Sequence, residues 1–482
     1  MHSHALSDRT ALDTRAKRLG AALISGVMLS MAGSLHPWWL IAWIAPIPLL
    51  LAAFSAARGE TLMLAAVAAL IGSISITSYY LEVAGPPATI VITILRVVMM
   101  IIIVGAARAA VVKWGRWYSI FVYPALAAGL DTLVATISRH GTAGSIAYSQ
   151  MNALPVIQIA SITGTSGIVF VMSVFASAIA VAWYRRRDFS ELRVAYALSA
   201  IIMVGALAYG SARLALAAQA ATLPVGLAVI DTVIDPHASV RDELWANYGK
   251  AVAALAQQGA QIVVLPEKIA AVDPAAADQM RNVLANVART NAIYLVAGVT
   301  IVKADHKENR AWLFTPDGQF AADYSKQHLV PGFEDAFVPG NEVVVRTITG
   351  VQMGVAICKD MDFSRLGRDY SSRRIRMMLV PAWDFGRDGW QHSRMSMLRG
   401  VEGGFTIARA ARDGLLTVSD RYGRIHGQAH SATTPYAGIV VNAALGPELE
   451  TPYARFGDVF GWIALAFSVI ASLWAALRPT AH

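Results

Sequence analysis

The first 215 residues of the chain contain about seven apolar stretches in close succession, each roughly 20 residues long. A helix needs about 20 apolar residues to cross the hydrocarbon core of a bilayer. An eighth stretch of this kind lies near the C-terminus. The predicted spans are residues 17–35, 38–56, 62–83, 87–110, 118–137, 162–184, 193–212 and 456–477. The pattern therefore predicts a multi-span α-helical membrane domain, residues 1–215, and a C-terminal transmembrane helix.

Composition excludes several other classes of protein. Charged residues make up 15% of the chain, against about 25% in soluble domains. Residues 1–220 hold 15 Lys and Arg against 7 Asp and Glu, whereas residues 221–482 are balanced. A basic excess confined to the apolar half indicates membrane topology and no nucleic-acid partner. The single cysteine excludes a disulfide framework and a multi-cysteine metal site.

The basic residues between the spans predict the orientation. Cytoplasmic loops carry an excess of Lys and Arg, and here every second loop is basic. The charges on that side are Arg9, Arg15, Lys17, Arg18, Arg58, Arg108, Lys113, Arg116, Arg185, Arg186, Arg187 and Arg193. The N-terminus is therefore expected in the cytoplasm, and residues 216–455 outside it. Arg478 returns to the inner side. Residues 142–161 fit either an outer-surface helix or part of the sixth span.

Residues 222–446 have a different pattern, in which short apolar runs alternate with helical stretches. Strands are expected at 225–230, 261–267, 293–302, 351–358 and 376–385, a hairpin follows around Arg412–Gly414, and helices are expected at 239–258, 276–290 and 390–403. This alternation predicts an α/β domain of sheets covered by helices.

Three chemically active residues stand at the ends of predicted strands, where α/β sheets build their sites. Glu267 ends VVLPE, Lys326 follows AADYS, and Cys358 ends GVAIC. Each residue alone is most often structural. Together they fit nucleophilic catalysis, with a thiol, a general base and an ammonium that stabilises an oxyanion. His328 and His392 are alternative bases, although neither ends a strand.

These residues resemble the Glu-Lys-Cys triad of the carbon–nitrogen hydrolase (nitrilase) superfamily, which implies an αββα sandwich. Seven spans, an external domain and a last span further resemble the apolipoprotein N-acyltransferase family. The segment KQHLVPGFE is similar to that family's lysine loop and implies a second catalytic acid, Glu334. Other matching segments are WQH, with Trp390 and His392 as substrate-binding candidates, and YARFGD before the last span.

The chain also departs from the family pattern. An aromatic residue and a glutamate usually follow the nucleophile, whereas Lys359 and Asp360 stand here. These two residues are assigned to the oxyanion site and its surroundings, with the Lys359 backbone N–H as a donor. The loop after Glu334 is short, and the aromatic residues Phe333 and Phe337, which flank Glu334, are candidates for contact with an acyl chain. Glu334 is expected to act from this loop, and a solvated loop acid is the alternative.

The resemblance implies an enzyme of a bacterial inner membrane that needs no cofactor. It would move a phospholipid acyl chain through a thioester to the N-terminal amine of a diacylglyceryl-cysteine lipoprotein. The alternatives are a membrane-bound amidase or nitrilase with the same triad, and a transporter or receptor with a degenerate enzyme domain. Eight spans exceed what a soluble substrate requires, because one span already anchors a domain. This favours the acyltransferase.

Overall fold

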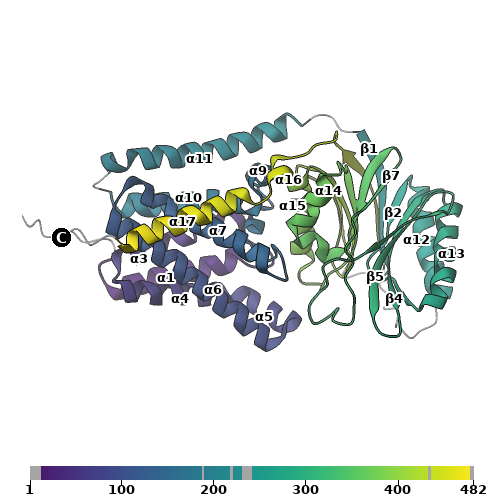
Figure 1. Cartoon of the computed structure of the whole chain (residues 1–482), viewed down its shortest axis with the longest axis horizontal. Helices are drawn as coiled ribbons and strands as arrows, with labels where there is room; N and C mark the ends of the chain where they lie inside the picture. Colours follow the sequence, from purple (N-terminus) through teal and green to yellow (C-terminus); the bar gives the residue numbers. More distant parts are fainter. Residues whose placement is uncertain (1–11, 187–188, 218–220, 231–241, 432–435, 478–482) are drawn as a thin grey trace, which may run out of the picture.

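The computed structural model describes residues 12–186, 189–217, 221–230, 242–431 and 436–477. Arg9, Arg187 and Arg478, whose charges enter the predicted topology, lie outside these ranges, as do residues 239–241 of a predicted helix. Two bodies lie end to end along the long axis, a bundle of helices and a domain of sheets (Figure 1). The C-terminal helix α17 (Val459–Leu477) leaves the sheet domain and runs back along the bundle.

The bundle contains a helix at each predicted span. Its longer helices are α1 (Arg15–Ala32), α3 (Pro46–Ser55), α4 (Arg58–Gly72), α5 (Ile74–Val83), α6 (Gly85–Arg108), α7 (Val122–Ile137), α10 (Thr165–Tyr184) and α11 (Phe189–Ala215), with the short α2 (Trp39–Ile44) before α3. By length and composition, four helices in the described ranges can cross a membrane, or five if α4 and α5, bent by 58°, form one span. Eight spans therefore stay a prediction.

Residues 142–161 do not extend the sixth span. They form three short helical turns, η3 (Ile146–Gln150), α8 (Leu154–Ile157) and α9 (Ala160–Thr163), the last of which begins within this stretch. Gly164, with a φ of +67°, separates α9 from α10. Apolar side chains of these turns pack against Met395, Leu398 and Val401 of the sheet domain. The segment therefore forms the apolar junction between the two bodies.

The sheet domain consists of two stacked sheets with helices on both outer faces. One sheet has the order β13-β1-β2-β4-β5-β6, with β3 beside β4, and the other has the order β12-β11-β10-β9-β8-β7. The strands of the first sheet are β13 (Tyr436–Leu445), β1 (Ala221–Ile230), β2 (Ile262–Val264), β3 (Ala270–Val272), β4 (Tyr294–Val302), β5 (Lys307–Phe314) and β6 (Phe320–Ser325). Those of the second are β12 (Ile425–His430), β11 (Leu415–Ser419), β10 (Thr406–Arg412), β9 (Met377–Trp383), β8 (Val351–Val355) and β7 (Val344–Ile348).

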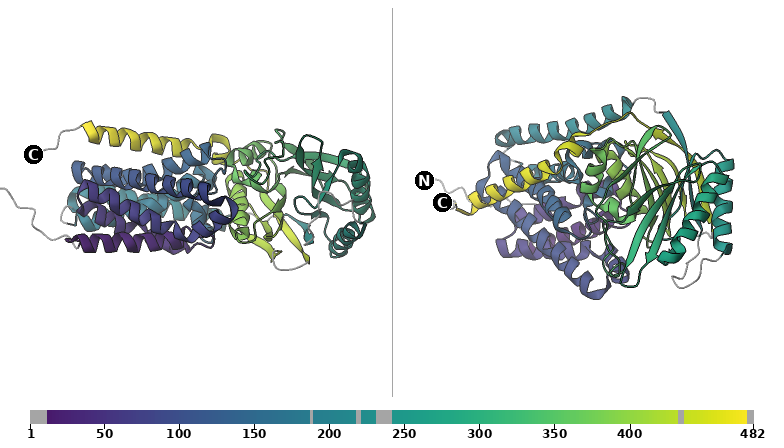
Figure 2. Two further views of the ribbon diagram at one scale, coloured as in Figure 1. Left: turned by 90° about the horizontal axis from the view of Figure 1, so that it is seen from below. Right: turned by 45° about the vertical axis from the view of Figure 1, so that its right-hand side comes forward.

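Helices complete the four layers. Helices α12 (Asp242–Gln257) and α13 (Pro274–Thr290) cover the first sheet, and α14 (Ser364–Ser371) and α15 (Gly389–Gly403) cover the second on the side of the bundle (Figures 1 and 2). One apolar core fills the space between the sheets, and a second lies under α12 and α13. This arrangement is the expected αββα sandwich. The short helix α16 (Pro452–Phe456) connects the sandwich to α17.

Several predicted strands are shorter than expected, and two of them end before a chemically active residue. The strand predicted at 261–267 ends at Val264, and the strand predicted at 351–358 ends at Val355. In both cases the chain turns before the chemically active residue, so Glu267 and Cys358 stand in turns that follow the strands.

Candidate active site

The three triad residues come from both sheets of the sandwich. Glu267 follows β2 and Lys326 follows β6, both in the first sheet, whereas Cys358 follows β8 of the second. The backbone N–H of Glu267 bridges the sheets by donating to the carbonyl oxygen of Ala382, at 3.3 Å. Gly298 on β4 lies beneath, where a Cβ atom would stand 2.5 Å from the Glu267 Cα atom. This position therefore needs glycine.

Lys326 is held between two buried carboxylates. Its Nζ lies 2.9 Å from Glu267 Oε1 and 2.8 Å from Glu334 Oε2. All three residues are at most 2% exposed. Glu334 thus stands in a loop, as expected, but its carboxylate is buried, which excludes the solvated loop acid. The Val330 backbone N–H also donates to it, at 2.8 Å.

Two residues that the sequence did not single out complete this cluster. The Asn309 Nδ2 donates to Glu267 at 2.6 Å and to Glu334 at 2.7 Å, and Lys268 Nζ lies 2.6 Å from Glu334 Oε1. Lys268 also lies 3.8 Å from Glu267. The cluster therefore pairs two carboxylates with two ammonium groups, which is the condition under which buried charges are tolerated.

The charges of this cluster fix the protonation states. Burial opposes the Lys326 charge, but Glu267, Cys358 and Glu334 outweigh it and raise the pKa of Lys326. Burial also opposes the Glu334 charge, yet Lys326 and Lys268 lower the pKa of Glu334 to about 2. Lys326 is therefore an ammonium and Glu334 a carboxylate at neutral pH.

Cys358 opens the short helical turn η4 (Cys358–Asp362) in a strained conformation, with a φ of +44°. Its side chain is 7% exposed, and Sγ lies 3.4 Å from the carbonyl oxygen of Trp383. Burial and the Glu267 charge raise the pKa of Cys358 well above its usual value, and Lys326 opposes them. Cys358 is therefore a thiol at neutral pH, and an attack by its sulfur would require a base.

Lys359 and Asp360, the two residues after Cys358, make different contacts. The backbone N–H of Lys359 has no backbone acceptor among the described residues and can donate to an oxyanion. Its side chain, by contrast, is buried, and Nζ lies 3.0 Å from His140 Nδ1. Asp360 accepts from the N–H groups of Ile357, Gln327 and His328, at 2.9–3.1 Å. Asp360 thus connects the loop that follows Lys326 to the turn Cys358–Asp362, called the nucleophile turn below.

The predicted lipid-contacting aromatics lie on either side of Glu334. Phe333 is 53% exposed and packs on Phe385, with ring centroids 4.8 Å apart. The Phe337 ring lies under Lys268, whose Nζ is 4.8 Å from its centroid. Phe333 is therefore available to an apolar ligand, whereas Phe337 is already engaged by the charged cluster.

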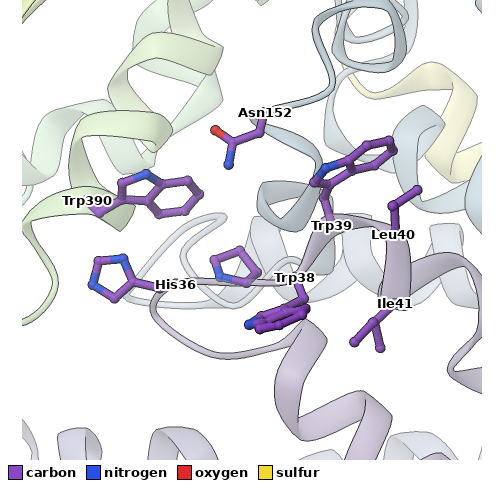
Figure 3. Close-up of a pocket in the computed structure, with 8 residues that line it drawn as sticks. His36, Trp38, Trp39, Leu40, Ile41, Asn152 and Trp390 are labelled. Atoms are coloured by element: carbon purple, nitrogen blue, oxygen red, sulfur yellow. The ribbon is translucent and has the colours of Figure 1, made fainter.

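Trp390 lines a pocket at the junction of the two bodies (Figure 3). The pocket has a volume of about 360 Å³, and the ring centroids of Trp390 and His36 are 6.0 Å apart. The remaining lining residues are Pro37, Trp38, Trp39, Leu40, Ile41 and Asn152. The pocket is therefore mainly apolar, with three tryptophans in its lining and an imidazole and a carboxamide as polar groups.

The two histidines that the sequence offered as bases have other partners. His328 Nδ1 lies 3.1 Å from Asp360, and its ring stacks on Phe363 at 3.7 Å. His392 Nε2 lies 3.1 Å from Asp388. Among the described residues, no group of three or more His, Cys, Asp and Glu could hold a metal ion. Glu267 therefore stays the predicted base.

Comparisons with known proteins agree with this geometry. The family described as carbon–nitrogen hydrolase matches residues 227–455, and the apolipoprotein N-acyltransferase N-terminal domain matches residues 25–178. Together they define a membrane enzyme in which a nitrilase-like domain is joined to a helical bundle.

Individual relatives differ in how much of the chain they match. An apolipoprotein N-acyltransferase of Geobacter metallireducens is 28% identical over 96% of both chains. The omega-amidase NIT2 of Homo sapiens is 32% identical, but over only 26% of this chain and 52% of that protein. A crystal structure of an amidase from Nesterenkonia sp. covers 50% of this chain and 95% of that one, at 23% identity and a TM-score of 0.40. The chain is therefore similar to apolipoprotein N-acyltransferases over nearly its whole length, whereas its similarity to the amidases is local.

The buried position of Glu334 predicts a large effect of its charge. Glu334→Gln keeps the shape but leaves Lys268 and Lys326 with fewer buried counter-ions, so we expect turnover to fall about tenfold to a hundredfold. The neighbouring Asp335 is an exposed acid, and Asp335→Asn is the matched control, with an expected rate near wild type. Turnover is measured at saturating substrate. Equal rates in the two variants would contradict a role for the Glu334 charge.

Replacement of Glu267 is predicted to lower turnover and, at the same time, to make the Cys358 thiol more acidic. Its negative charge raises the pKa of Cys358, so Glu267→Gln lowers that pKa while removing the base. We expect turnover to fall by about 10²–10⁴. The pH midpoint of Cys358 alkylation by iodoacetamide should move down. Glu308→Gln, on strand β5 of the same sheet, is the control. A pH midpoint of alkylation that moves up in Glu267→Gln, or an unchanged turnover, would contradict the assignment of Glu267 as the base.

Proposed function

We propose that this chain is an N-acyltransferase that takes an acyl chain from a membrane phospholipid. It passes the acyl group through a thioester on Cys358 to the N-terminal amine of a diacylglyceryl-cysteine lipoprotein. One observation carries the proposal: the nucleophile turn touches the membrane domain. The backbone N–H and the hydroxyl of Thr142 donate to the carbonyl oxygen of Asp362, at 3.0 and 2.8 Å. The thiol therefore works where both bilayer-bound substrates can reach it.

The first half-reaction forms the thioester. Glu267 takes the Cys358 proton, and Sγ attacks the ester carbonyl carbon of the phospholipid. The Lys326 ammonium and the Lys359 backbone N–H stabilise the negative charge that develops on the carbonyl oxygen. The carbon–oxygen bond then breaks, and Glu267 returns the proton to the leaving alcohol oxygen of the lysophospholipid.

The second half-reaction forms the amide. The free α-amine of the acceptor attacks the thioester carbonyl carbon, and Glu267 takes a proton from the attacking nitrogen. The carbon–sulfur bond breaks, and that proton passes to the Cys358 sulfur. The same groups stabilise both tetrahedral intermediates, which is why one site serves both halves.

The membrane domain supplies substrates in this proposal. Trp38, Trp39 and Trp390 surround the junction pocket, and tryptophan is enriched at the level of lipid headgroups. The pocket would hold the interfacial part of a lipid, with Asn152 and His36 facing its polar atoms. The exposed ring of Phe333 would contact the acyl chain beside Glu334. Charge placement in the loops supports a catalytic domain on the outer side of the membrane, and similarity to a bacterial apolipoprotein N-acyltransferase supports a bacterial inner membrane.

The test is a paired assay of the purified protein in phospholipid vesicles. With a phospholipid labelled in its acyl chain and a diacylglyceryl-cysteine peptide, we expect labelled amide to form. Cys358→Ser should form at least about 10²-fold less, because its hydroxyl is far less acidic than a thiol. A soluble primary amide is offered in parallel. Hydrolysis of that amide without labelled peptide would contradict the proposal and favour an amidase.

A further inference from the structure

His392 lies between two buried carboxylates outside the triad. Its Nε2 is 3.1 Å from Asp388 Oδ2, and its Nδ1 is 3.7 Å from Asp362 Oδ1. Asp388 precedes helix α15, and Asp362 is the last residue of the nucleophile turn. Asp388 and Asp362 are at most 2% exposed. The imidazole thus bridges the start of α15 and the turn that begins with Cys358.

The bridge is ionic at neutral pH. Burial opposes a charge on His392, but Asp388 and Asp362 outweigh it and raise its pKa well above the usual value. Burial likewise opposes the Asp388 charge, yet His392 lowers the pKa of Asp388 to about 2. Lys359 Nζ lies 3.8 Å from Asp362 on its other side. Two cations and two anions therefore balance, and removal of one leaves a buried charge unpaired.

Both ends of this network rest on the membrane domain. The hydroxyl of Tyr79, on α5, donates to Asp388 Oδ2 at 2.6 Å. At the other end, His140, in the segment after α7, contacts Lys359. Next to it, Gly141 has a φ of +52°, and a Cβ atom there would stand 2.4 Å from the Asp362 carbonyl oxygen. The network therefore runs without a gap from α5, through the nucleophile turn, to the segment after α7.

The nucleophile turn needs such support. A non-glycine residue at positive φ is strained and persists only where its surroundings determine it. Cys358 is such a residue, and within the described ranges neither sheet hydrogen-bonds the far end of its turn at Asp362. We propose that His392 is a positioning residue, whose ion pairs with Asp362 and Asp388 hold the Cys358 turn in place and couple it to helix α5. This deepens the proposed function, on which it rests for its acyl-transfer readout.

The experiment compares His392→Gln and Tyr79→Phe with a matched control, His426→Gln. His426 also pairs with an aspartate, Asp420, at 3.2 Å, but lies on β12 away from the turn. We expect His392→Gln to lower kcat for acyl transfer about tenfold to a hundredfold, with KM within about twofold, because the thiol is misplaced. Tyr79→Phe should lower kcat about threefold to tenfold. The fold-decrease in kcat of the double variant should be smaller than the product of the two single fold-decreases, because both residues act through one network. The control should keep the wild-type kcat.

A second readout needs no lipid substrate. Burial raises the pKa of the Cys358 thiol, so release of the turn should move the pH midpoint of iodoacetamide alkylation down, towards the ordinary thiol value of about 8.5. An unchanged midpoint together with wild-type kcat in His392→Gln would overturn the proposal. A raised KM at unchanged kcat would overturn it too, in favour of direct substrate contact.

Two further outcomes separate the positioning role of His392 from a folding defect and from a failure of the proposed acyl transfer. If His392→Gln unfolds at a lower temperature and does not fold into the membrane, Tyr79→Phe becomes the deciding variant, because it removes one hydroxyl only. A wild-type kcat in Tyr79→Phe would overturn the coupling of the Cys358 turn to helix α5. If the wild-type protein transfers no acyl group, the proposed function fails. The shift of the alkylation midpoint in His392→Gln would still support the positioning role.

Discussion

The buried ion cluster around Lys326 is the interaction on which the site depends. Taking a charge out of water costs several kcal/mol even in a real protein interior. Glu267, Lys326 and Glu334 are each at most 2% exposed, so none is tolerable without the others. They come from the end of β2, the end of β6 and the following loop. The charges therefore stabilise one another only when the sandwich has formed, which couples the folded state to the catalytic arrangement.

The second constraint is the strained nucleophile turn. Its first residue, Cys358, is held at the edge of one sheet, whereas its last residue, Asp362, is bound by Thr142 of the membrane domain. The nitrilase-like sandwich supplies all three triad residues, but the geometry of the turn also depends on the bundle. This dependence gives the helices a role beyond anchoring, because one span would anchor the domain.

Sequence patterns predicted the triad because each member follows an apolar run at a sheet edge. They also predicted an α/β domain with helices near 239–258, 276–290 and 390–403, and the resemblance to the nitrilase superfamily added the αββα sandwich. Asn309 and Lys268 escaped notice, since Asn309 lies within a strand, and Lys268 looks like a solvated neighbour of Glu267. Nothing local marks a residue that acts through contacts distant in sequence. Strand β12 was missed because its exposed, polar pattern lacks a buried run.

The most direct measurement is the intact mass of the protein after incubation with phospholipid vesicles and no acceptor. The thioester mechanism predicts a mass increase equal to one acyl group, located on Cys358 by peptide mapping and removed by neutral hydroxylamine. Addition of a diacylglyceryl-cysteine peptide should then return the protein to its original mass. An unmodified Cys358, or an adduct that the peptide does not discharge, would contradict the account.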